Sequence, residues 1–416
     1  MTMAELKEHP VTQLDVSAAQ PSDDVARNTA RGATNSTIDW RRWFGLREMG
    51  IYYALLLLVI GLSIVTAYTG RANYLSFLNV TNVLYQSSLT AMMAIAMTVI
   101  LISGNFDLSV ASVAALSAAV LVSLADALGF WPAVLVSMLV ATGAGMLNGS
   151  IVQLLGINAF IVTLGTLTAI RGVVLIYTDG QSLSAQSPEV IQAMRTFESG
   201  RVEVALPLAV VGAALVAGGL FLAWRARQKA VRLAPSAFAT ILGGLCLVAP
   251  LLFGEGQFAL PKPIIYMAVY AAAVWFVLTF TTVGRRLYAV GGNPEAARLS
   301  GINVVRYKMA AFVLCSATAG FAGVLFASRL RSVNPAALQG AELTVIAAAI
   351  LGGTSLFGGA GSVIKTIAGA LLLFALTNGF NILNLGANYQ GLIEGIVVVV
   401  AAAIYTVGGS GRRRKT

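Results

Sequence analysis

The 416-residue sequence is 57% hydrophobic and only 11% charged, and its mean hydropathy is +0.82. Ordinary water-soluble domains carry about 25% charged residues, so this composition excludes a soluble globular protein. The formal net charge of +10 comes from basic residues that flank apolar runs instead of forming one face, which argues against nucleic-acid binding. Long apolar stretches recur along the chain, and we predict an all-α, polytopic membrane protein.

The first 45 residues are predicted to form a disordered cytoplasmic leader. Residues 1–45 are polar and partly acidic, with almost no apolar periodicity. The first apolar run starts near Ile51, which is too late and too long for a cleaved secretory leader. Residues 46–412 then form the predicted transmembrane domain, and residues 413–416 form a basic cytoplasmic tail.

Between ten and twelve transmembrane helices are predicted in this domain. Each apolar run is long enough, at about 1.5 Å per residue, to cross a hydrocarbon core of about 30 Å. The candidate spans lie near residues 50–69, 83–103, 108–126, 130–155, 159–177, 204–224, 236–253, 262–282, 309–329, 342–357, 362–384 and 390–408. Dense glycine in "GGTSLFGGAG" predicts that the span near 342–357 is broken or sharply bent.

Basic residues predict that both ends of the chain are cytoplasmic. With both ends inside, sixteen lysines and arginines fall on the cytoplasmic side and six on the opposite side. The cytoplasmic ones gather in four clusters, at 41–47, 225–232, 285–308 and 412–415. Cytoplasmic loops of membrane proteins carry such an excess of lysine and arginine, so this orientation is preferred.

A short internal repeat predicts an inverted-topology transporter. The stretches "NGSIVQLLGINAFIVTLG" from Asn148 and "NGFNILNLGANYQGLIEG" from Asn378 share Asn-Gly, Leu-Gly, Asn and a final Gly at identical spacing. In the twelve-span count, the first copy ends a span that heads inward and the second ends one that heads outward. Inverted repeats of this kind are typical of transporters.

A short polar helix is predicted between two apolar spans, in the stretch "AVGGNPEAARLSGINVVRYK" from Ala289. Asn293 suits an N-cap and Pro294 the first helical position. Glu295 complements the positive helix end, and Gly301 suits a left-handed C-cap. A helix this short has only marginal stability in water, and other contacts must therefore hold it in place. Two interpretations stay open: a helix on which a separate motor protein pushes, and an interfacial helix that rests at the lipid headgroups.

No catalytic, metal or cofactor site is predicted. The chain has no G-x-x-x-x-G-K-[ST] phosphate loop and no nucleophile elbow. Its single histidine, His9, lies in the leader, and both cysteines, Cys246 and Cys315, fall inside apolar runs. Neither a metal cluster nor a disulfide framework is therefore indicated. We expect no enzyme, and the energy for transport must come from elsewhere.

Four motifs follow one another along the transmembrane domain: "SGNFDLSVAS" from Ser103, "TLGTLTAIRG" from Thr163, "GNPEAARLSGI" from Gly292 and "LGGTSLFGGAGS" from Leu351. Together they resemble the membrane permeases of ATP-binding-cassette importers for monosaccharides, of the ribose, xylose and galactose type. The resemblance covers about residues 50–408. Asn105 and Ala111 depart from it, because relatives commonly have glycine there.

The resemblance implies an inverted-repeat permease that works as a homodimer by alternating access in the bacterial inner membrane. Its implied partners are cassette ATPase subunits, a periplasmic sugar-binding protein and a monosaccharide substrate. Residues 204–253 form an extra helix pair that resembles the longer xylose-type permeases, which favours a pentose such as xylose. The loop 284–308 is the implied cytoplasmic coupling loop. Its expected contacts with the ATPase are Asn293, Pro294, Glu295, Ala296, Ala297, Arg298 and Gly301.

Polar residues within or beside apolar runs are the candidates for a translocation pathway, because such groups are costly in a membrane. Arg171 lies deep in an apolar run and must find a carboxylate, carbonyl groups or water. Asp107 is either a functional group at a broken helix or a simple N-cap. Glu342 faces the sugar or the binding protein. The candidates are Asn105, Asp107, Ser109, Arg171, Glu342, Gly352, Gly353, Thr354, Asn378 and Glu394.

Other functions stay open on the sequence. One is a permease of the same importer class for a branched-chain amino acid or a nucleoside. Another is a secondary transporter, which would need an intramembrane carboxylate such as Asp107 or Glu394 to carry its coupling ion. A membrane-embedded enzyme is the third.

Overall fold

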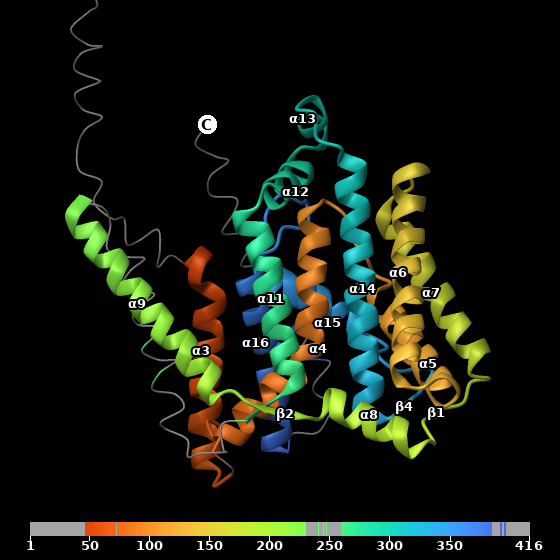
Figure 1. Ribbon diagram of the computed structural model, residues 1–416, viewed down its shortest axis with the longest axis horizontal. Helices are drawn as coiled ribbons and strands as arrows, with labels where there is room; N and C mark the ends of the chain where they lie inside the picture. The colour runs from red at the N-terminus through yellow and green to blue at the C-terminus, as the bar shows by residue number, and fades with distance from the viewer. Residues whose placement is uncertain are drawn as a thin grey trace, which may run out of the picture. The chain divides into compact units, whose positions relative to one another are not determined.

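The computed structural model describes residues 46–71, 73–229 and 259–384, together with positions 240, 244, 247, 392, 395 and 396. The chain forms two compact units, Met1–Met49 and Gly50–Thr416, and the helical bundle belongs to the second. Eight helices in the described part are long and apolar enough to cross a membrane (Figure 1). The predicted all-α, polytopic membrane class is confirmed.

The eight candidate membrane helices coincide with predicted spans. They are α3 (Leu46–Tyr68), α4 (Phe77–Ile102), α5 (Val110–Leu128), α6 (Phe130–Leu154), α7 (Ala159–Tyr177), α11 (Lys262–Phe280), α14 (Val304–Leu330) and α16 (Val363–Leu383). The leader 1–45 and the tail 413–416 lie outside the described residues, as do nearly all of the predicted spans 236–253 and 390–408.

Two predicted spans take a different form. The span near 204–224 is α9 (Ala205–Lys229), whose apolar part runs from Pro207 to Phe221. The span near 342–357 is α15 (Ala341–Leu351), which has 11 residues. At about 1.5 Å per residue it is roughly 17 Å long, about half of a hydrocarbon core. The glycines predicted to break this span do so, since α15 ends at Leu351, Gly352 is its C-cap, and Gly353 follows with a φ of +77°.

Side-chain caps set where several of these helices begin. Ser76, Asn158 and Asn303 each accept a hydrogen bond from a backbone N–H in the first turn of α4, α7 and α14. Ser362 does the same for α16. These caps satisfy backbone donors in the first turn that have no partner within the helix.

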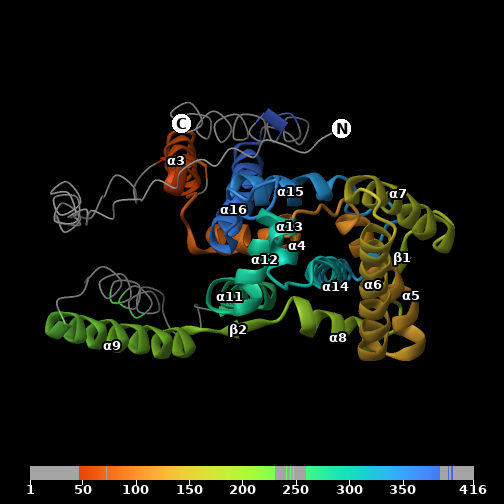
Figure 2. The same cartoon turned by 90° about the horizontal axis from the view of Figure 1, so that it is seen from above.

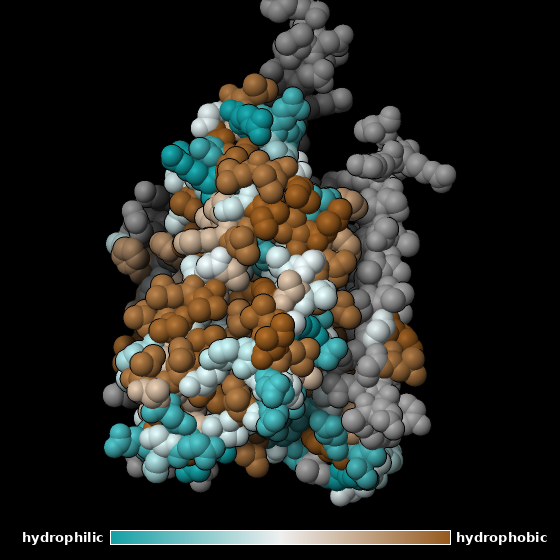
Figure 3. All heavy atoms as spheres, turned by 90° about the vertical axis from the view of Figure 1, so that its right-hand side faces the viewer, coloured by the Kyte–Doolittle hydropathy of each residue, from teal (hydrophilic) through white to brown (hydrophobic). Residues whose placement is uncertain are grey.

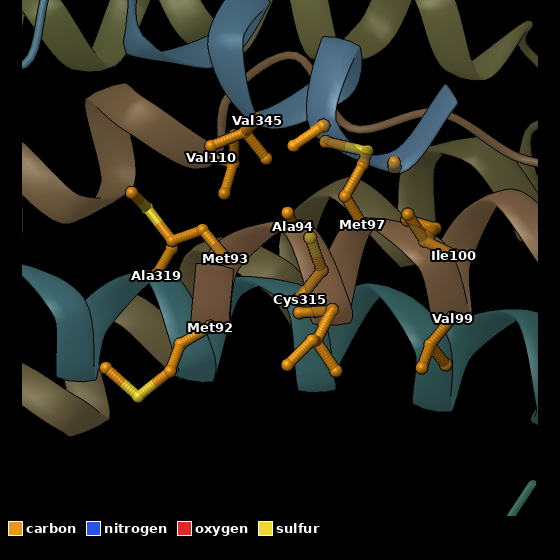
Figure 4. Close-up of a cluster of buried hydrophobic side chains, with 14 of the residues drawn as sticks. Met92, Met93, Ala94, Met97, Val99, Ile100, Val110, Cys315, Ala319 and Val345 are labelled. Atoms are coloured by element: carbon orange, nitrogen blue, oxygen red, sulfur yellow. The ribbon is translucent and has the colours of Figure 1, made fainter. Parts of the chain in front are cut away.

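Helices α4 and α14 lie at the centre of the bundle. Every residue of α4 from Ser87 to Ile102 is buried, against α11, α14, α15 and α16. In Figure 4, the methionines of α4 lie between α14, which bears Cys315, and α15, which bears Val345. The core is therefore built around the second part of α4, whereas its first turns carry exposed apolar residues such as Leu78.

Small residues allow the helices around α14 to approach closely. A Cβ added to Gly145 of α6 would lie 2.7 Å from the Cβ of Ser316 in α14. A Cβ added to Gly323 of α14 would overlap the backbone carbonyl of Ala114 in α5. Close contact through glycine is typical of helix packing inside membranes.

The two ends of the bundle carry different short elements (Figure 1). At the first, which we name the α8 end, lie α8 (Pro188–Glu198) and two antiparallel strand pairs: β1 (Leu183–Ser184) with β4 (Ser332–Val333), and β2 (Arg201–Glu203) with β3 (Ala259–Pro261). At the other, the α13 end, lie α12 (Thr282–Gly292) and α13 (Pro294–Leu299), which face the viewer near α4 in Figure 2. Hydrophobic side chains predominate across the middle of the face in Figure 3 and hydrophilic ones gather toward its ends, as in a membrane-spanning protein.

Candidate functional site

The predicted polar helix is present as α13, and its caps are the predicted ones. Asn293 Oδ1 accepts a hydrogen bond from the N–H of Ala296 at 2.9 Å, and Pro294 occupies the first helical position. Gly301 follows with a φ of +77°, the left-handed conformation expected at the end of a helix. The capping prediction is confirmed.

A small hydrophobic core holds α13 in place. Ala297 is buried against Val290 of α12 and Val304 of α14, and Ile302 and Tyr307 pack around them. These contacts supply the support that an isolated helix of six residues lacks.

The outward surface of α13 combines charge with one apolar side chain. Glu295 and Arg298 are exposed, and Leu299, the last residue of α13, is 85% exposed. An apolar residue with a charged rim is typical of surfaces that bind another protein. The helix thus turns its only buried residue toward the bundle and its charges away from it.

Three distant segments meet through glycines at the α13 end. The N–H of Gly359 donates to the carbonyl of Ile102, the last residue of α4, at 2.9 Å. Gly291 of α12 lies so close that an added Cβ would overlap the Ile102 carbonyl oxygen. A Cβ on Gly358 would lie 2.6 Å from the carbonyl oxygen of Gly291 and 2.9 Å from Gly104. We name Gly104, Gly291, Gly358 and Gly359 the glycine contact.

A tyrosine of α12 strengthens the glycine contact. The Tyr288 hydroxyl donates to the carbonyl of Gly361 at 2.9 Å. A tyrosine hydroxyl is protonated at neutral pH, and burial raises the pKa of Tyr288 further, so this hydroxyl remains a donor. Three of the four sequence motifs therefore meet at or beside one point. Gly291 and Gly358 were not among the predicted site residues. The high density of glycine around both positions was the feature of the sequence that could have indicated them.

A buried polar network joins Asp107, Ser109 and Asn148. Asp107 Oδ1 accepts from the Ser109 N–H at 3.0 Å and from its hydroxyl at 2.5 Å, and Asn148 Nδ2 donates to Ser109 Oγ at 2.9 Å. All three side chains are buried. Ser109 occupies the N-cap position of α5 without a side-chain capping bond, whereas the Asp107 carboxylate accepts the N–H of Ser109 at the start of the helix, as a capping group does. Asp107 Oδ2 and Asn148 Oδ1 have no hydrogen-bond partner among the described residues.

Arg171 and Glu342 form an ion pair between α7 and α15. A guanidinium nitrogen of Arg171 lies 3.2 Å from Glu342 Oε2, and the two side chains are 20% and 13% exposed. The prediction that Arg171 must find a partner is confirmed. Pairing makes both charges compatible with a membrane interior.

Two further candidate pathway residues lie in helix-packing contacts with α4. The Thr98 hydroxyl lies 3.4 Å from that of Thr354 and 2.7 Å from that of Thr366. Asn378 of α16 exchanges two side-chain hydrogen bonds with Asn79 of α4, at 3.0 and 3.1 Å. Both contacts join α4 to the segments that surround it.

Two cavities at opposite ends of the bundle lie among the described residues. One, of about 460 Å³ at the α13 end, is lined by Asn105, Lys308 and neighbouring residues. The other, of about 570 Å³ at the α8 end, is lined by Asn79, Tyr85 and neighbouring residues. Among the described candidates for the pathway, only Asn105 lines either of these two cavities. Glu394 lies outside the described residues. The described candidates do not converge on either of these two cavities.

Residues 79–402 match the family described as branched-chain amino acid transport system / permease component. The xylose transport system permease protein of Escherichia coli (strain K12) is 32% identical over 372 residues, which cover 86% of this chain and 92% of that protein. The ribose import permease protein of the same strain is also 32% identical over 372 residues, with 89% and 98% covered. The ribose import permease protein of Bacillus subtilis (strain 168) is 31% identical over 362 residues, with 86% and 92% covered. No solved structure matches. The family match covers most of the helical bundle, and the matches to these relatives cover most of both chains. The chain therefore belongs to the branched-chain amino acid transport system / permease component family.

Proposed function

We propose that this protein is the membrane-spanning subunit of an ATP-binding-cassette importer for a monosaccharide, a pentose such as xylose, in the bacterial inner membrane. The observation that carries the proposal is α13, a capped helix fixed on its own hydrophobic core with its charges directed away from the bundle. An interfacial helix instead directs its apolar face into lipid. Ala297, the buried residue of α13, faces α12 and α14, which favours a protein partner.

In this proposal, two copies of the chain form a homodimer that binds two cassette ATPase domains and one periplasmic sugar-binding protein. ATP binding closes the cassettes, and the segment Asn293–Gly301 receives that movement. The glycine contact passes it to the end of α4, which lies at the centre of the bundle. The sugar crosses at the dimer axis by alternating access. This arrangement agrees with the described candidate pathway residues, which share neither of the two cavities of this chain given above.

The permease itself is expected to bind the sugar weakly. A site tight enough to select the sugar would slow its release, so selectivity resides mainly in the binding protein. ATP is hydrolysed by the separate cassette subunit, and this chain needs no cofactor.

Xylose is preferred over ribose because the extra helix pair resembles the layout of xylose-type permeases. Helix α9 supplies a helix in the first half of that segment. The relatives named for xylose and ribose support a pentose equally. The description of the matched family makes a branched-chain amino acid the second candidate substrate.

Uptake by reconstituted vesicles tests the proposed function. With the partner ATPase, the binding protein and ATP present, labelled xylose should accumulate far above its level in vesicles without ATP. Ribose and galactose serve as competitors, and leucine and adenosine serve as tests of the rival substrates. Accumulation should persist when an ionophore collapses ion gradients, because ATP supplies the energy. Accumulation of leucine in place of xylose, or loss of uptake with the ionophore alone, would contradict the proposal.

Cysteine labelling tests the proposed orientation. In a background without Cys246 and Cys315, a cysteine at Glu295 should be protected from an impermeant thiol reagent added outside intact cells. A cysteine at Gln192, on the exposed side of α8, should react, because the α8 end then faces outward. Permeabilised cells provide the control in which both positions react. Labelling of position 295 from outside would contradict the proposed orientation and indicate the opposite one.

A further inference from the structure

Glu198, the last residue of α8, is a fully buried carboxylate at the α8 end. Its Oε1 accepts hydrogen bonds from the Tyr85 hydroxyl at 2.7 Å and from Arg329 Nε at 2.8 Å, and its Oε2 accepts from the Ser199 hydroxyl at 2.9 Å. The Arg329 guanidinium also lies 3.9 Å from the centre of the Tyr85 ring. We name Tyr85, Glu198 and Arg329 the α8 latch.

The α8 latch joins one surface helix to the two central helices. Tyr85 belongs to α4 and Arg329 to α14. The guanidinium of Arg329 also donates to the Tyr85 backbone carbonyl at 3.3 Å. Helices α4, α8 and α14 are therefore joined at one point. A buried charge whose partner is removed is strongly unfavourable, so α8 cannot leave α14 without a large cost.

Apolar contacts hold α8 independently of the latch. Phe197, beside Glu198, has ring-centroid distances of 5.4 Å to Phe130 of α6, 5.5 Å to Tyr266 of α11 and 6.2 Å to Phe321 of α14. Because these rings remain when the charges are removed, α8 should stay folded in variants of the latch.

Helices α4 and α14, which the α8 latch joins, also reach the elements at the α13 end. Helix α4 ends at Ile102, in the glycine contact with α12. Helix α14 begins at Val304, in the hydrophobic core under α13. An unbroken series of contacts therefore runs from α8, through α4 and α14, to the exposed surface of α13.

We propose that Glu198 is a positioning residue for transport: it makes α4 and α14 follow a displacement of α8, so that docking of the loaded binding protein at the α8 end reaches the ATPase at α13. This inference rests on the proposed function. The exposed side of α8, with Glu189, Gln192 and Arg195, is the surface on which such a partner would act. These contacts provide a route between α8 and α13, and only a measurement of energetic coupling between the two ends tests whether the protein uses it.

The test compares ATP hydrolysis by the complete importer with and without sugar-loaded binding protein. In Glu198→Gln, basal hydrolysis should be unchanged, whereas stimulation by the binding protein should fall by at least about fivefold, the lower range of allosteric coupling. Arg329→Gln should behave in the same way. The double variant should be no worse than either single variant, because all three remove one interaction. The melting temperature in detergent should fall most in Arg329→Gln, because that variant leaves the buried Glu198 carboxylate without its cation. The ring contacts of Phe197 should keep α8 folded in all three variants.

Arg331→Gln is the matched control, because Arg331 lies two residues from Arg329 and forms no ion pair among the described residues. It should keep full stimulation. If Glu198→Gln does not fold, Tyr85→Phe removes only the hydroxyl that donates to Glu198 and should reduce stimulation partly. Full stimulation in the folded latch variants, Tyr85→Phe included, overturns the inference. Absence of sugar uptake by the unaltered importer would instead overturn the proposed function.

Discussion

Replacement of Gly291 with alanine is expected to abolish transport while the protein still inserts into the membrane. The added Cβ would overlap the carbonyl oxygen of Ile102 and would lie 2.8 Å from the backbone nitrogen of Gly359. Both are backbone atoms and cannot rotate away, so α12 must move off the end of α4. Overpacking of this kind costs about 1 to 3 kcal/mol. Sugar uptake in vesicles should fall to background, while the ATPase keeps its basal activity.

Gly292, the next residue of the same helix, provides the matched control. A Cβ at Gly292 would meet only the Cα of Gly359, at 3.9 Å, which is ordinary contact. Because alanine also favours helix by about 1 kcal/mol over glycine, Gly292→Ala should insert and transport like the unaltered protein. Equal transport by Gly291→Ala and Gly292→Ala would remove the glycine contact from the proposed mechanism.

Replacement of Gly301 with valine is expected to uncouple transport from ATP hydrolysis. The backbone of Gly301 has a φ of +77°, and a β-branched side chain there is strained by about 1 kcal/mol or more. No atom lies within 4 Å of the added Cβ, so the effect comes from the backbone and not from a clash. The strain tilts α13 on its hydrophobic core and displaces its outward surface. Sugar uptake and binding-protein-stimulated hydrolysis should fall together, while basal hydrolysis survives.

Asparagine gives a graded control at the same position, because it enters the left-handed region more readily than valine. Gly301→Asn should therefore keep more activity than Gly301→Val. The combination of Gly301→Val with Glu295→Arg removes both the turn and an exposed charge of α13. Normal transport by this double variant would mean that α13 is an interfacial helix and that the ATPase docks elsewhere.

Features set by neighbouring residues could be predicted from the sequence. The spans follow from the length of the apolar runs, which is a local property. The caps of α13 were predictable because Asn293, Pro294 and Gly301 act within one turn of the helix that they bound. The shortness of α15 was only partly predictable, since glycine density marks a break but does not say how many residues precede it.

Features set by distant residues could not be predicted in the same way. Arg171 had to find a partner, but no sequence pattern singles out Glu342, which lies 171 positions further along the chain. Glu198 reads as an ordinary polar residue at the end of a surface helix, yet it is fully buried. Asp107 was interpreted as either a functional group or a cap; its carboxylate accepts the Ser109 N–H, but its full burial and its link through Ser109 to Asn148 of α6 were not predictable. Each of these outcomes depends on which helices pack together.

The pairing of Arg171 with Glu342 bears on how the membrane voltage acts on this protein. A single charge that crosses a membrane at 100 mV exchanges about 2.3 kcal/mol with the electric field. The ion pair joins α7 to α15 and has no net formal charge. If both side chains move together, the field therefore does little net work on them. The resting potential of the cell would then neither drive nor oppose the movement of this ion pair.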